Sequence, residues 1–348
     1  MNLIRNFADR VKVYRAKAPL RISFCGGGTD MPEFFNDHGG AVLSTGIDKY
    51  SFVSLIPRED TKVKIKSLDF DLNIEFNVDK APIFDGVLDL AKATIHELKL
   101  KKGFDLYVYS EVPPGSGLGT SSTFTVAILG VLLKFLNDSW DKYDIAETAY
   151  QIERIKLAIK GGKQDQYAAA FGGFNLIEFH KDKTIVNALT IHKSILNDLQ
   201  CHLMMCYTGN THYSTELTEK QLKFYKEGRK ETIDALPILK QMTYEMKDSL
   251  MVGDLRRFGE ILHESGLIKK QANPYVTDDH IDKLYNLARE HGVIGGKILG
   301  AGAGGFLLLF CEVAKKDEIA KILVKEGGQI LNFGFDKKGL QTWTSNCL

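Results

Sequence analysis

The 348-residue sequence has no long hydrophobic run and no excess of charge of one sign. No uninterrupted apolar stretch approaches the roughly 20 residues that a membrane-spanning helix needs, and the opening stretch MNLIRNFADRVKVYRAKAPL lacks the apolar segment of a signal peptide. The 45 Lys and Arg residues balance 44 Asp and Glu residues, a balance that does not indicate a nucleic-acid or membrane partner. We therefore expect a cytoplasmic protein, and anionic small molecules remain possible ligands.

Cysteine is scarce and irregularly spaced. No CxxC motif or paired histidine spacing accompanies the five cysteines, which lie among apolar neighbours: Cys25, Cys201, Cys206, Cys311 and Cys347. We expect buried, reduced thiols rather than a disulfide framework or a metal centre. Hydrophobic residues make up 44% of the chain, which suits a packed globular protein with room for two domains of ordinary size.

Short β-favouring runs dominate the chain from Val11 to about Phe76. The runs VKVYRA, LRISF, AVLSTGI, SFVSLIP and VKIKSL are separated by Gly, Pro or charged turns, and they predict a mostly antiparallel sheet. Helical periodicity then predicts helices at about 85–99, 119–136 and 141–159, with FDLYVYSEV as a strand between the first two.

The second half of the chain is richer in helix. After the predicted strands FGGFNLIEF and CHLMMCYTG, several long amphipathic helices occupy about 212–291, and VIGGKIL, GGFLLLF, a helix near 315–326 and terminal strands follow. Because strands and helices do not alternate strictly, this order predicts an α+β fold. Charge density rises in HKDKTIVNAL, so we expect a boundary near residue 185 between domains 1–185 and 186–348.

The stretch EVPPGSGLGTSSTFTVAILG, residues 111–130, combines three glycines, three hydroxyl side chains and a helical apolar run. Free backbone N–H groups, the positive end of a helix dipole and short donors together favour a phosphate site at the start of this helix. An elaborate N-cap is the simpler alternative. A Walker A loop is excluded because no lysine precedes Thr120 or Ser121.

Two further glycine clusters occur. GGGTD places Gly26, Gly27 and Gly28 before a carboxylate and a predicted helix, where the backbone either approaches a ligand or makes a tight turn. GGKILGAGAGGFLLLF satisfies G-x-G-x-x-G at 300–305, but FLLLF predicts a strand and not the helix that a dinucleotide site requires. A glycine hairpin against a ligand loop, or a simple β-turn, explains this second cluster better.

One pair of carboxylates fits phosphoryl transfer. Glu153 lies in a predicted amphipathic helix, and Asp165 follows a Gly161-Gly162 break at the start of a small-residue helix. Transfer from a nucleotide needs Mg²⁺ and often a carboxylate that accepts or orients the proton of the attacking hydroxyl, two roles that this pair would divide. The alternative is a surface Glu153 and a helix-capping Asp165.

The motifs APLRISFCGGGTD, PPGSGLGTSS, ERIKLAIKGGKQDQ and KILGAGAGG, in this order, resemble those of the galactokinase, homoserine kinase, mevalonate kinase and phosphomevalonate kinase (GHMP kinase) superfamily over about residues 13–310. GGGTD, GLGTSST and GGKQDQYAAAFGG most resemble the D-glycero-D-manno-heptose 7-phosphate kinases of surface-glycan biosynthesis, with fucokinases as close relatives. The resemblance implies an N-terminal ribosomal-protein-S5-like domain, a C-terminal ferredoxin-like domain and an active site between them.

The resemblance also implies roles for residues, with ATP and Mg²⁺ as cofactors. Asp165 matches the catalytic Asp and Arg21 the basic residue that faces it, while Ser121 and Glu153 match the Mg²⁺ ligands. The residues that would bind ATP are Pro114, Gly115, Ser116, Gly117, Leu118, Gly119, Thr120, Ser121 and Ser122. The residues that would bind the sugar are Gly26, Gly27, Gly28, Thr29, Asp30, Gly302, Ala303 and Gly304.

Asp30 matches the sugar-binding Asp of galactokinases, which favours a carbohydrate acceptor and, with the heptose-kinase resemblance, a sugar phosphate. His212 stands where relatives often have Arg, and Lys17, Lys160 and Lys163 are either phosphate ligands or scattered surface lysines. The resemblance leaves open a fucokinase- or galactokinase-like enzyme for an unphosphorylated sugar and a non-catalytic sugar-binding regulator. A homodimer is one oligomeric state that the sequence leaves open.

Overall fold

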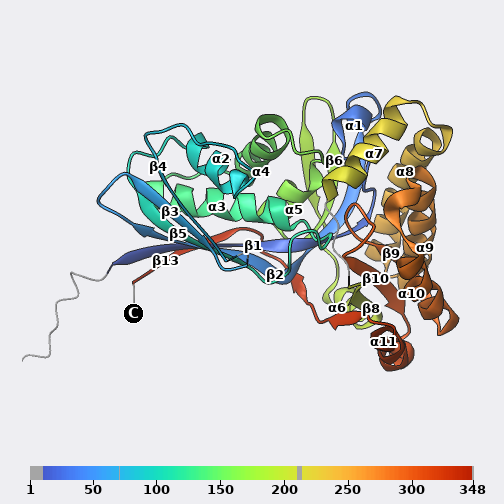
Figure 1. Ribbon diagram of the computed structural model, residues 1–348. Coiled ribbons are helices and arrows are strands. Elements are labelled where there is room, and N and C mark those ends of the chain that lie inside the picture. Colours follow the sequence, from blue (N-terminus) through green and yellow to red (C-terminus); the bar gives the residue numbers. More distant parts are fainter. Residues whose placement is uncertain (1–10, 70, 210–213, 347–348) are drawn as a thin grey trace, which may run out of the picture.

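The chain was analysed as a computed structural model that describes residues 11–69, 71–209 and 214–346. A large sheet covered by helices forms one end of the molecule, and a small sheet packed among longer helices forms the other end (Figure 1). This α+β architecture is the one predicted from the order of strands and helices. No helix within the described ranges is both long and apolar enough to cross a membrane.

The large sheet has the strand order β13-β1-β2-β5-β3-β4, with β6, β7 and β12 joined to it through β2 and β6. Every pairing in it is antiparallel except β3 with β5, which confirms the predicted mostly antiparallel sheet. Its strands are β1 (Lys12–Cys25), β2 (Gly40–Pro57), β3 (Lys62–Ser67), β4 (Leu72–Asn77), β5 (Phe104–Ser110), β6 (Phe174–Phe179), β7 (Thr184–Ala188), β12 (Phe335–Asp336) and β13 (Gln341–Asn346).

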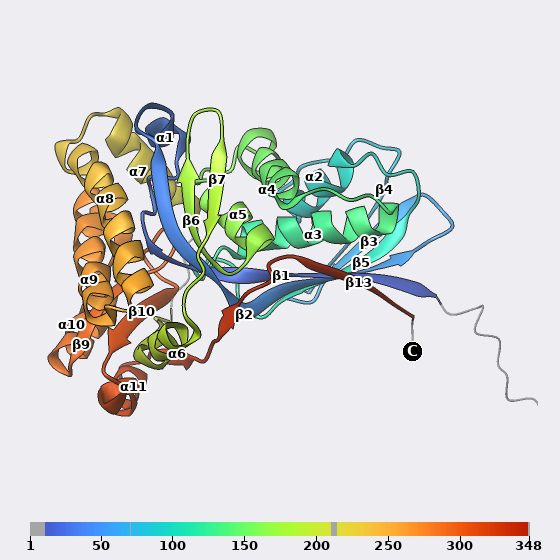
Figure 2. The ribbon, with the colours of Figure 1, turned by 180° about the vertical axis from the view of Figure 1, so that it is seen from behind.

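Helices cover one face of this sheet, as the view from behind also shows (Figure 2). The covering helices are α2 (Asp89–Glu97), α3 (Thr120–Leu136), α4 (Lys142–Tyr150) and α5 (Gln164–Phe171). The long helix α3 is almost entirely buried between residues 122 and 133, and it forms the centre of the first hydrophobic core with side chains from β2, β3 and β5. Burial of this apolar helix fixes the position of its N-terminus, where the predicted phosphate site lies.

The small antiparallel sheet has the order β11-β8-β10-β9 and lies between two layers of helices. Alternate side chains of β10 enter different cores: Leu308 and Phe310 pack with Met246 and Phe258 of α8 and α9, while Leu307 and its neighbours pack against α10 and α11. The elements are α6 (Lys193–His202), β8 (Leu203–Tyr207), α7 (Ser214–Lys226), α8 (Lys230–Val252), α9 (Leu255–Ala272), α10 (Asp279–Glu290), β9 (Val293–Ile298), β10 (Phe306–Cys311), α11 (Lys316–Lys325) and β11 (Gln329–Leu331).

Some predicted boundaries are wrong. VKVYRA and LRISF form one continuous strand, β1, and AVLSTGI and SFVSLIP form another, β2. Pro19 does not break β1, because the pairing with β2 shifts register between Pro19 and Arg21 and so accommodates the residue that lacks an N–H. The predicted helix 141–159 ends as an α-helix at Tyr150 and continues as a π-helical turn over Gln151–Lys156, which contains Glu153.

The predicted domain boundary at residue 185 lies within β7, and the last strands of the chain return to the large sheet. The division into 1–185 and 186–348 therefore stays a prediction about folding units. The expectation of buried cysteines holds for Cys25, Cys206 and Cys311 but is wrong for Cys201, which is exposed near the end of α6. Cys347 lies outside the described residues.

Candidate active site

The predicted phosphate loop ends at the open N-terminus of α3. Gly119 precedes the helix with a φ of 78°, and no side chain caps the first turn. Gly117, with a φ of 81°, lies so close to the loop after β9 that an added Cβ would be 2.8 Å from the Leu299 carbonyl oxygen. The uncapped N–H groups and the helix dipole make this terminus suitable for an anion.

The side chains of this loop differ in exposure. Ser116 and Leu118 are fully buried, and the Ser116 hydroxyl lies 3.2 Å from that of Thr120. Ser121 is exposed in the first turn of α3, whereas Ser122 points into the protein. Ser121 is therefore available to a ligand from solvent, and its predicted roles toward ATP and Mg²⁺ stay predictions.

A buried carboxylate lies behind this helix turn. The Ser122 hydroxyl donates to Glu153 Oε2 at 3.0 Å, and Gln166 Nε2 donates to the same hydroxyl at 3.0 Å. Glu153 is fully buried, and burial raises the pKa of its carboxyl even though Arg154 lies 3.6 Å away. Oε1 of Glu153 has no hydrogen-bond partner among the described residues, so this oxygen is available as a ligand for a cation.

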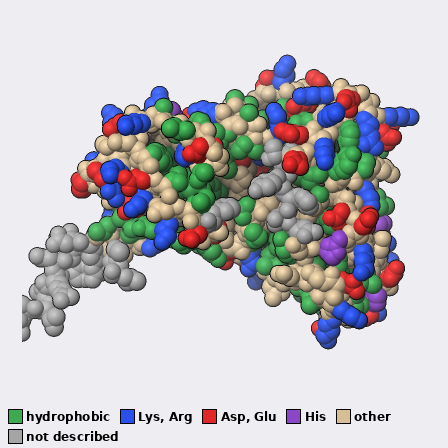
Figure 3. Space-filling model, in the orientation of Figure 1, with side chains coloured by type: hydrophobic (Ala, Val, Ile, Leu, Met, Phe, Trp, Pro, Cys, Tyr) green, Lys and Arg blue, Asp and Glu red, His purple; other side chains and the backbone are tan. Residues whose placement is uncertain are grey.

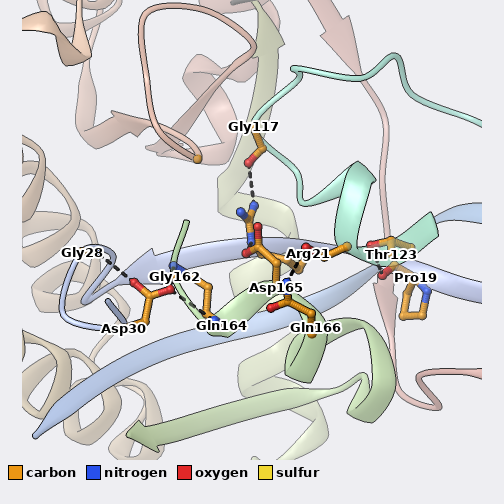
Figure 4. A network of polar contacts seen from close by, with 12 residues as sticks. Pro19, Arg21, Gly28, Asp30, Gly117, Thr123, Gly162, Gln164, Asp165 and Gln166 are labelled. Atoms are coloured by element: carbon orange, nitrogen blue, oxygen red, sulfur yellow. Dashed lines mark hydrogen bonds and ion pairs between the residues drawn. The ribbon is translucent and has the colours of Figure 1, made fainter. Parts of the chain in front are cut away.

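Arg21 joins the predicted catalytic carboxylate to the phosphate loop (Figure 4). Its Nε donates to Asp165 Oδ1 at 2.8 Å, and its Nη1 donates to the Gly117 carbonyl at 2.5 Å. An added Cβ on Gly119 would be 3.4 Å from the carboxyl carbon of Asp165, so this carboxylate lies beside the residue that precedes α3. The structure thus brings a carboxylate, a guanidinium and a helix N-terminus together, as a phosphoryl-transfer site requires.

The GGGTD loop folds around Asp30. Its carboxylate accepts hydrogen bonds from the Gly28 N–H at 2.9 Å, from the Gln164 N–H at 3.2 Å and from Gln164 Nε2 at 3.0 Å. Burial, and then the negative charge of Asp165, raise the pKa of Asp30. Gly162 approaches so closely that an added Cβ would be 1.9 Å from Asp30 Oδ2. The loop before Asp165 and the first glycine loop therefore share one carboxylate.

Gly26 and Thr29 of the GGGTD loop stabilise the local fold. Gly26 has a φ of 89°, and an added Cβ would be 1.9 Å from the Ala41 carbonyl oxygen, so the close approach to β2 requires glycine. The Thr29 hydroxyl donates to the carbonyls of Gly26 and Ala41 and is fully buried. Their predicted contacts with a sugar, like those of Gly27 and Gly28, stay predictions.

The third glycine loop, residues 299–305, joins the antiparallel strands β9 and β10 and packs on the phosphate loop, so the predicted glycine hairpin is confirmed. An added Cβ on Gly300 would be 2.5 Å from the Gly117 Cα, and the Phe306 N–H donates to the Ser116 carbonyl at 3.2 Å. Lys269 of α9 donates to the Gly300 carbonyl at 2.5 Å, and burial holds the pKa of this lysine well below its usual range. The sequence pattern missed Lys269, because nothing in LIKKQA distinguishes a lysine that packs on a glycine loop from a surface lysine.

Two of the three lysines named as possible phosphate ligands have partners within the protein. The Lys17 ammonium lies 4.0 Å from the centre of the Tyr50 ring, and Lys163 forms an ion pair with Glu147 at 2.8 Å. Lys160 is exposed in the loop before Gly162. His212 lies outside the described residues.

Family models match both parts of the chain: the GHMP kinases N terminal domain matches residues 86–173, and the GHMP kinases C terminal domain matches residues 246–329. A D-glycero-alpha-D-manno-heptose 7-phosphate kinase from Campylobacter jejuni is 37% identical over 96% of this chain and 99% of its own length.

Solved structures agree with this match. A D-glycero-D-manno-heptose 1-phosphate kinase from Bacteroides thetaiotaomicron superposes with a TM-score of 0.81 and 30% identity over 95% of this chain and 98% of that one. A putative sugar kinase from Campylobacter jejuni superposes with a TM-score of 0.79 and 34% identity over 98% of this chain and 100% of that one.

Proposed function

Because the chain belongs to the GHMP kinase family, we propose that it transfers the γ-phosphoryl group of ATP to the anomeric hydroxyl of D-glycero-D-manno-heptose 7-phosphate and forms the 1,7-bisphosphate. The observation that carries this proposal is the 37% identity to a heptose 7-phosphate kinase over nearly the whole length of both chains. The product would enter the synthesis of nucleotide-activated heptose for surface glycans. Dependence on ATP supports a cytoplasmic location.

The chain's own residues support a phosphoryl-transfer mechanism. The open N-terminus of α3 and the loop 114–122 would bind the phosphates of ATP. Asp165 would accept or orient the proton of the attacking sugar hydroxyl, and the Arg21 guanidinium holds its carboxylate in place beside the phosphate loop. Asp30 would accept hydrogen bonds from sugar hydroxyls after exchange with its present donors, which include Gln164.

Glu153 and Ser121 would hold Mg²⁺. The unpartnered Oε1 of the buried Glu153 and the exposed hydroxyl of Ser121 are oxygen donors of the kind that this cation takes in proteins. A bound Mg²⁺ would neutralise charge on the phosphates of the nucleotide. The Ser122 hydroxyl would position the Glu153 carboxylate, because it already donates to Oε2.

One structural relative favours a second candidate. The Bacteroides thetaiotaomicron protein is a heptose 1-phosphate kinase by its description, so its sugar carries the phosphate at another position. Fucokinases are also related to this chain, at 23 to 25% identity, which keeps an unphosphorylated sugar as an alternative.

An ADP-release assay separates these candidates. The purified protein would receive ATP, Mg²⁺ and in turn heptose 7-phosphate, heptose 1-phosphate, heptose, fucose, galactose or mannose, and kcat/KM would be compared. We expect the highest value with heptose 7-phosphate and a product phosphorylated at O1. A higher value with heptose 1-phosphate or fucose would replace the proposed acceptor.

A further inference from the structure

Three lysines surround one cavity beside the GGGTD loop. The cavity has a volume of about 400 Å³ and lies between the loop before Asp165 and helix α7. Its lining consists of Lys160, Glu219, Leu222, Lys223, Lys226 and Glu227. Lys and Arg side chains, interspersed with Asp and Glu, lie over this end of the molecule, where α7 and α8 lie (Figure 3).

Both walls of the cavity continue to the predicted sugar site. On one wall, Lys160 is two residues from Gly162, whose Cα lies against the Asp30 carboxylate. On the other wall, Gln221 of α7 precedes Leu222, and its Nε2 would be 2.6 Å from a Cβ added to Gly28. The proposed position of the sugar at Asp30 is therefore next to residues of both walls of the cavity.

The three lysines are free to exchange partners. Lys160 has no ion pair or hydrogen bond within the part of the chain that the structure describes. Lys223 lies 3.8 Å from Glu227, and Lys226 lies 3.7 Å from Glu33, distances too long for direct hydrogen bonds. The side chains of both lysines are about two-thirds exposed, so these pairs are weak.

We propose that Lys160, Lys223 and Lys226 bind the phosphate group that the acceptor sugar already carries, in the cavity between α7 and the loop before Asp165. This inference rests on the proposed function, because it assumes a phosphorylated acceptor. A dianionic phosphate forms charge-assisted hydrogen bonds with lysines. It would replace the Glu227 carboxylate at Lys223 and the Glu33 carboxylate at Lys226. Lys160, Lys223 and Lys226 would then select phosphorylated over unphosphorylated sugars.

Substitution of each lysine by Gln tests the proposal, with kcat/KM measured for heptose 7-phosphate and for heptose. We expect each single variant to lose roughly 3- to 10-fold with the phosphorylated sugar and to change little with heptose, since each removes one partly exposed charge contact. Lys220→Gln is the matched control, because Lys220 is on the same helix but lies over the Tyr275 ring, 4.4 Å from its centre. Unchanged thermal unfolding would show that the variants fold.

The opposite charge change gives a second measurement. Glu227→Gln removes a carboxylate from the cavity and releases Lys223, so kcat/KM for heptose 7-phosphate should rise or stay constant while that of the lysine variants falls. Equal losses with both sugars, or a Glu227→Gln variant as impaired as Lys223→Gln, would overturn the subsite. If the wild-type protein prefers an unphosphorylated sugar, the proposed function is wrong, and the proposed phosphate-binding role of the three lysines is then wrong as well.

Discussion

Replacement of Arg21 by Gln tests the link between the predicted phosphate loop and Asp165, the predicted catalytic carboxylate. The change removes one hydrogen bond to Asp165 and one to the Gly117 carbonyl. Removal of one partner from a buried ion pair costs about 3–5 kcal/mol, and hydrogen bonds to charged groups contribute about 1.5–3 kcal/mol each. Because the Asp165 side chain is 20% exposed, water recovers part of this loss, and we expect the free energy of unfolding to fall by about 2–4 kcal/mol.

The expected loss of activity is similar in size to the loss of stability, since a 10²-fold fall in kcat corresponds to about 2.7 kcal/mol. Without the guanidinium, the Asp165 carboxylate and the loop at Gly117 lose their common support, so kcat should fall by about 10²-fold, the scale of a misplaced general base. Asp165→Asn should lower kcat by about 10²-fold or more but leave ATP binding and most of the stability intact, because the amide oxygen still accepts from Arg21.

A double-mutant cycle measures the coupling. Stability would be followed by urea unfolding, and kcat by ADP release, for both single variants and for the double variant. We expect losses that are far from additive, since the two side chains act as one unit. Arg58→Gln is the control: Arg58 pairs with Asp60 and Asp105 at the surface, so this variant should unfold at nearly the same urea concentration as the wild-type protein and keep its kcat. Additive losses, or normal turnover of Arg21→Gln, would refute this account of the site.

Three further changes test other parts of the site. Glu153→Gln should raise the Mg²⁺ concentration needed for half-maximal rate and lower kcat, because a neutral amide is a weaker ligand; an unchanged Mg²⁺ titration would remove Glu153 from the metal site. Burial and the charge of Asp165 raise the pKa of Asp30, so KM for the sugar should rise as pH falls through that raised value, and Asp30→Asn should flatten the profile. Since the folded-state pKa of Asp30 lies above its unfolded value, ionisation of this group costs stability as pH rises, and the Asn variant should lose that slope in thermal unfolding. Gly117→Ala places a Cβ 2.8 Å from a backbone oxygen and should raise KM for ATP roughly tenfold, whereas Gly228→Ala, with a φ of 70° and open space, should cost only about 1 kcal/mol of stability.

Periodicity predicted the elements whose patterns are strong and local. The helix at 120–136 and the strands at 104–110 and 306–311 were found because each has a continuous apolar pattern between turn residues. Helix α6 and strands β4 and β7 were missed, since they are short and pairing or packing with neighbours in the fold stabilises them more than a long pattern of their own. The continuity of β1 through Pro19 depends on a register shift that only the partner strand supplies.

The site was predictable to a similar degree. Arg21 and Asp165 were paired through a family resemblance, and their ion pair at 2.8 Å confirms that they face each other. The contact between Ser122 and Glu153 was not predictable, because Glu153 lies in a π-helical turn, where a 3.6-residue repeat does not give the direction of the side chains. Lys269 was missed for another reason: its position is set by the packing of α9 against the third glycine loop, which the sequence of α9 does not show.

The position of the last strand affects how the chain is made. β13 pairs with β1, and the Arg15 side chain donates to the Ser345 hydroxyl across a separation of 330 residues. A ribosome releases β1 long before β13, so during synthesis this side of β1 has no strand to pair with, and its unpaired backbone groups are a template for other chains. The large sheet is completed only after the helix-rich end of the molecule has been synthesised. Premature termination near residue 330 would therefore yield an aggregation-prone chain even though every predicted ligand-binding residue is present.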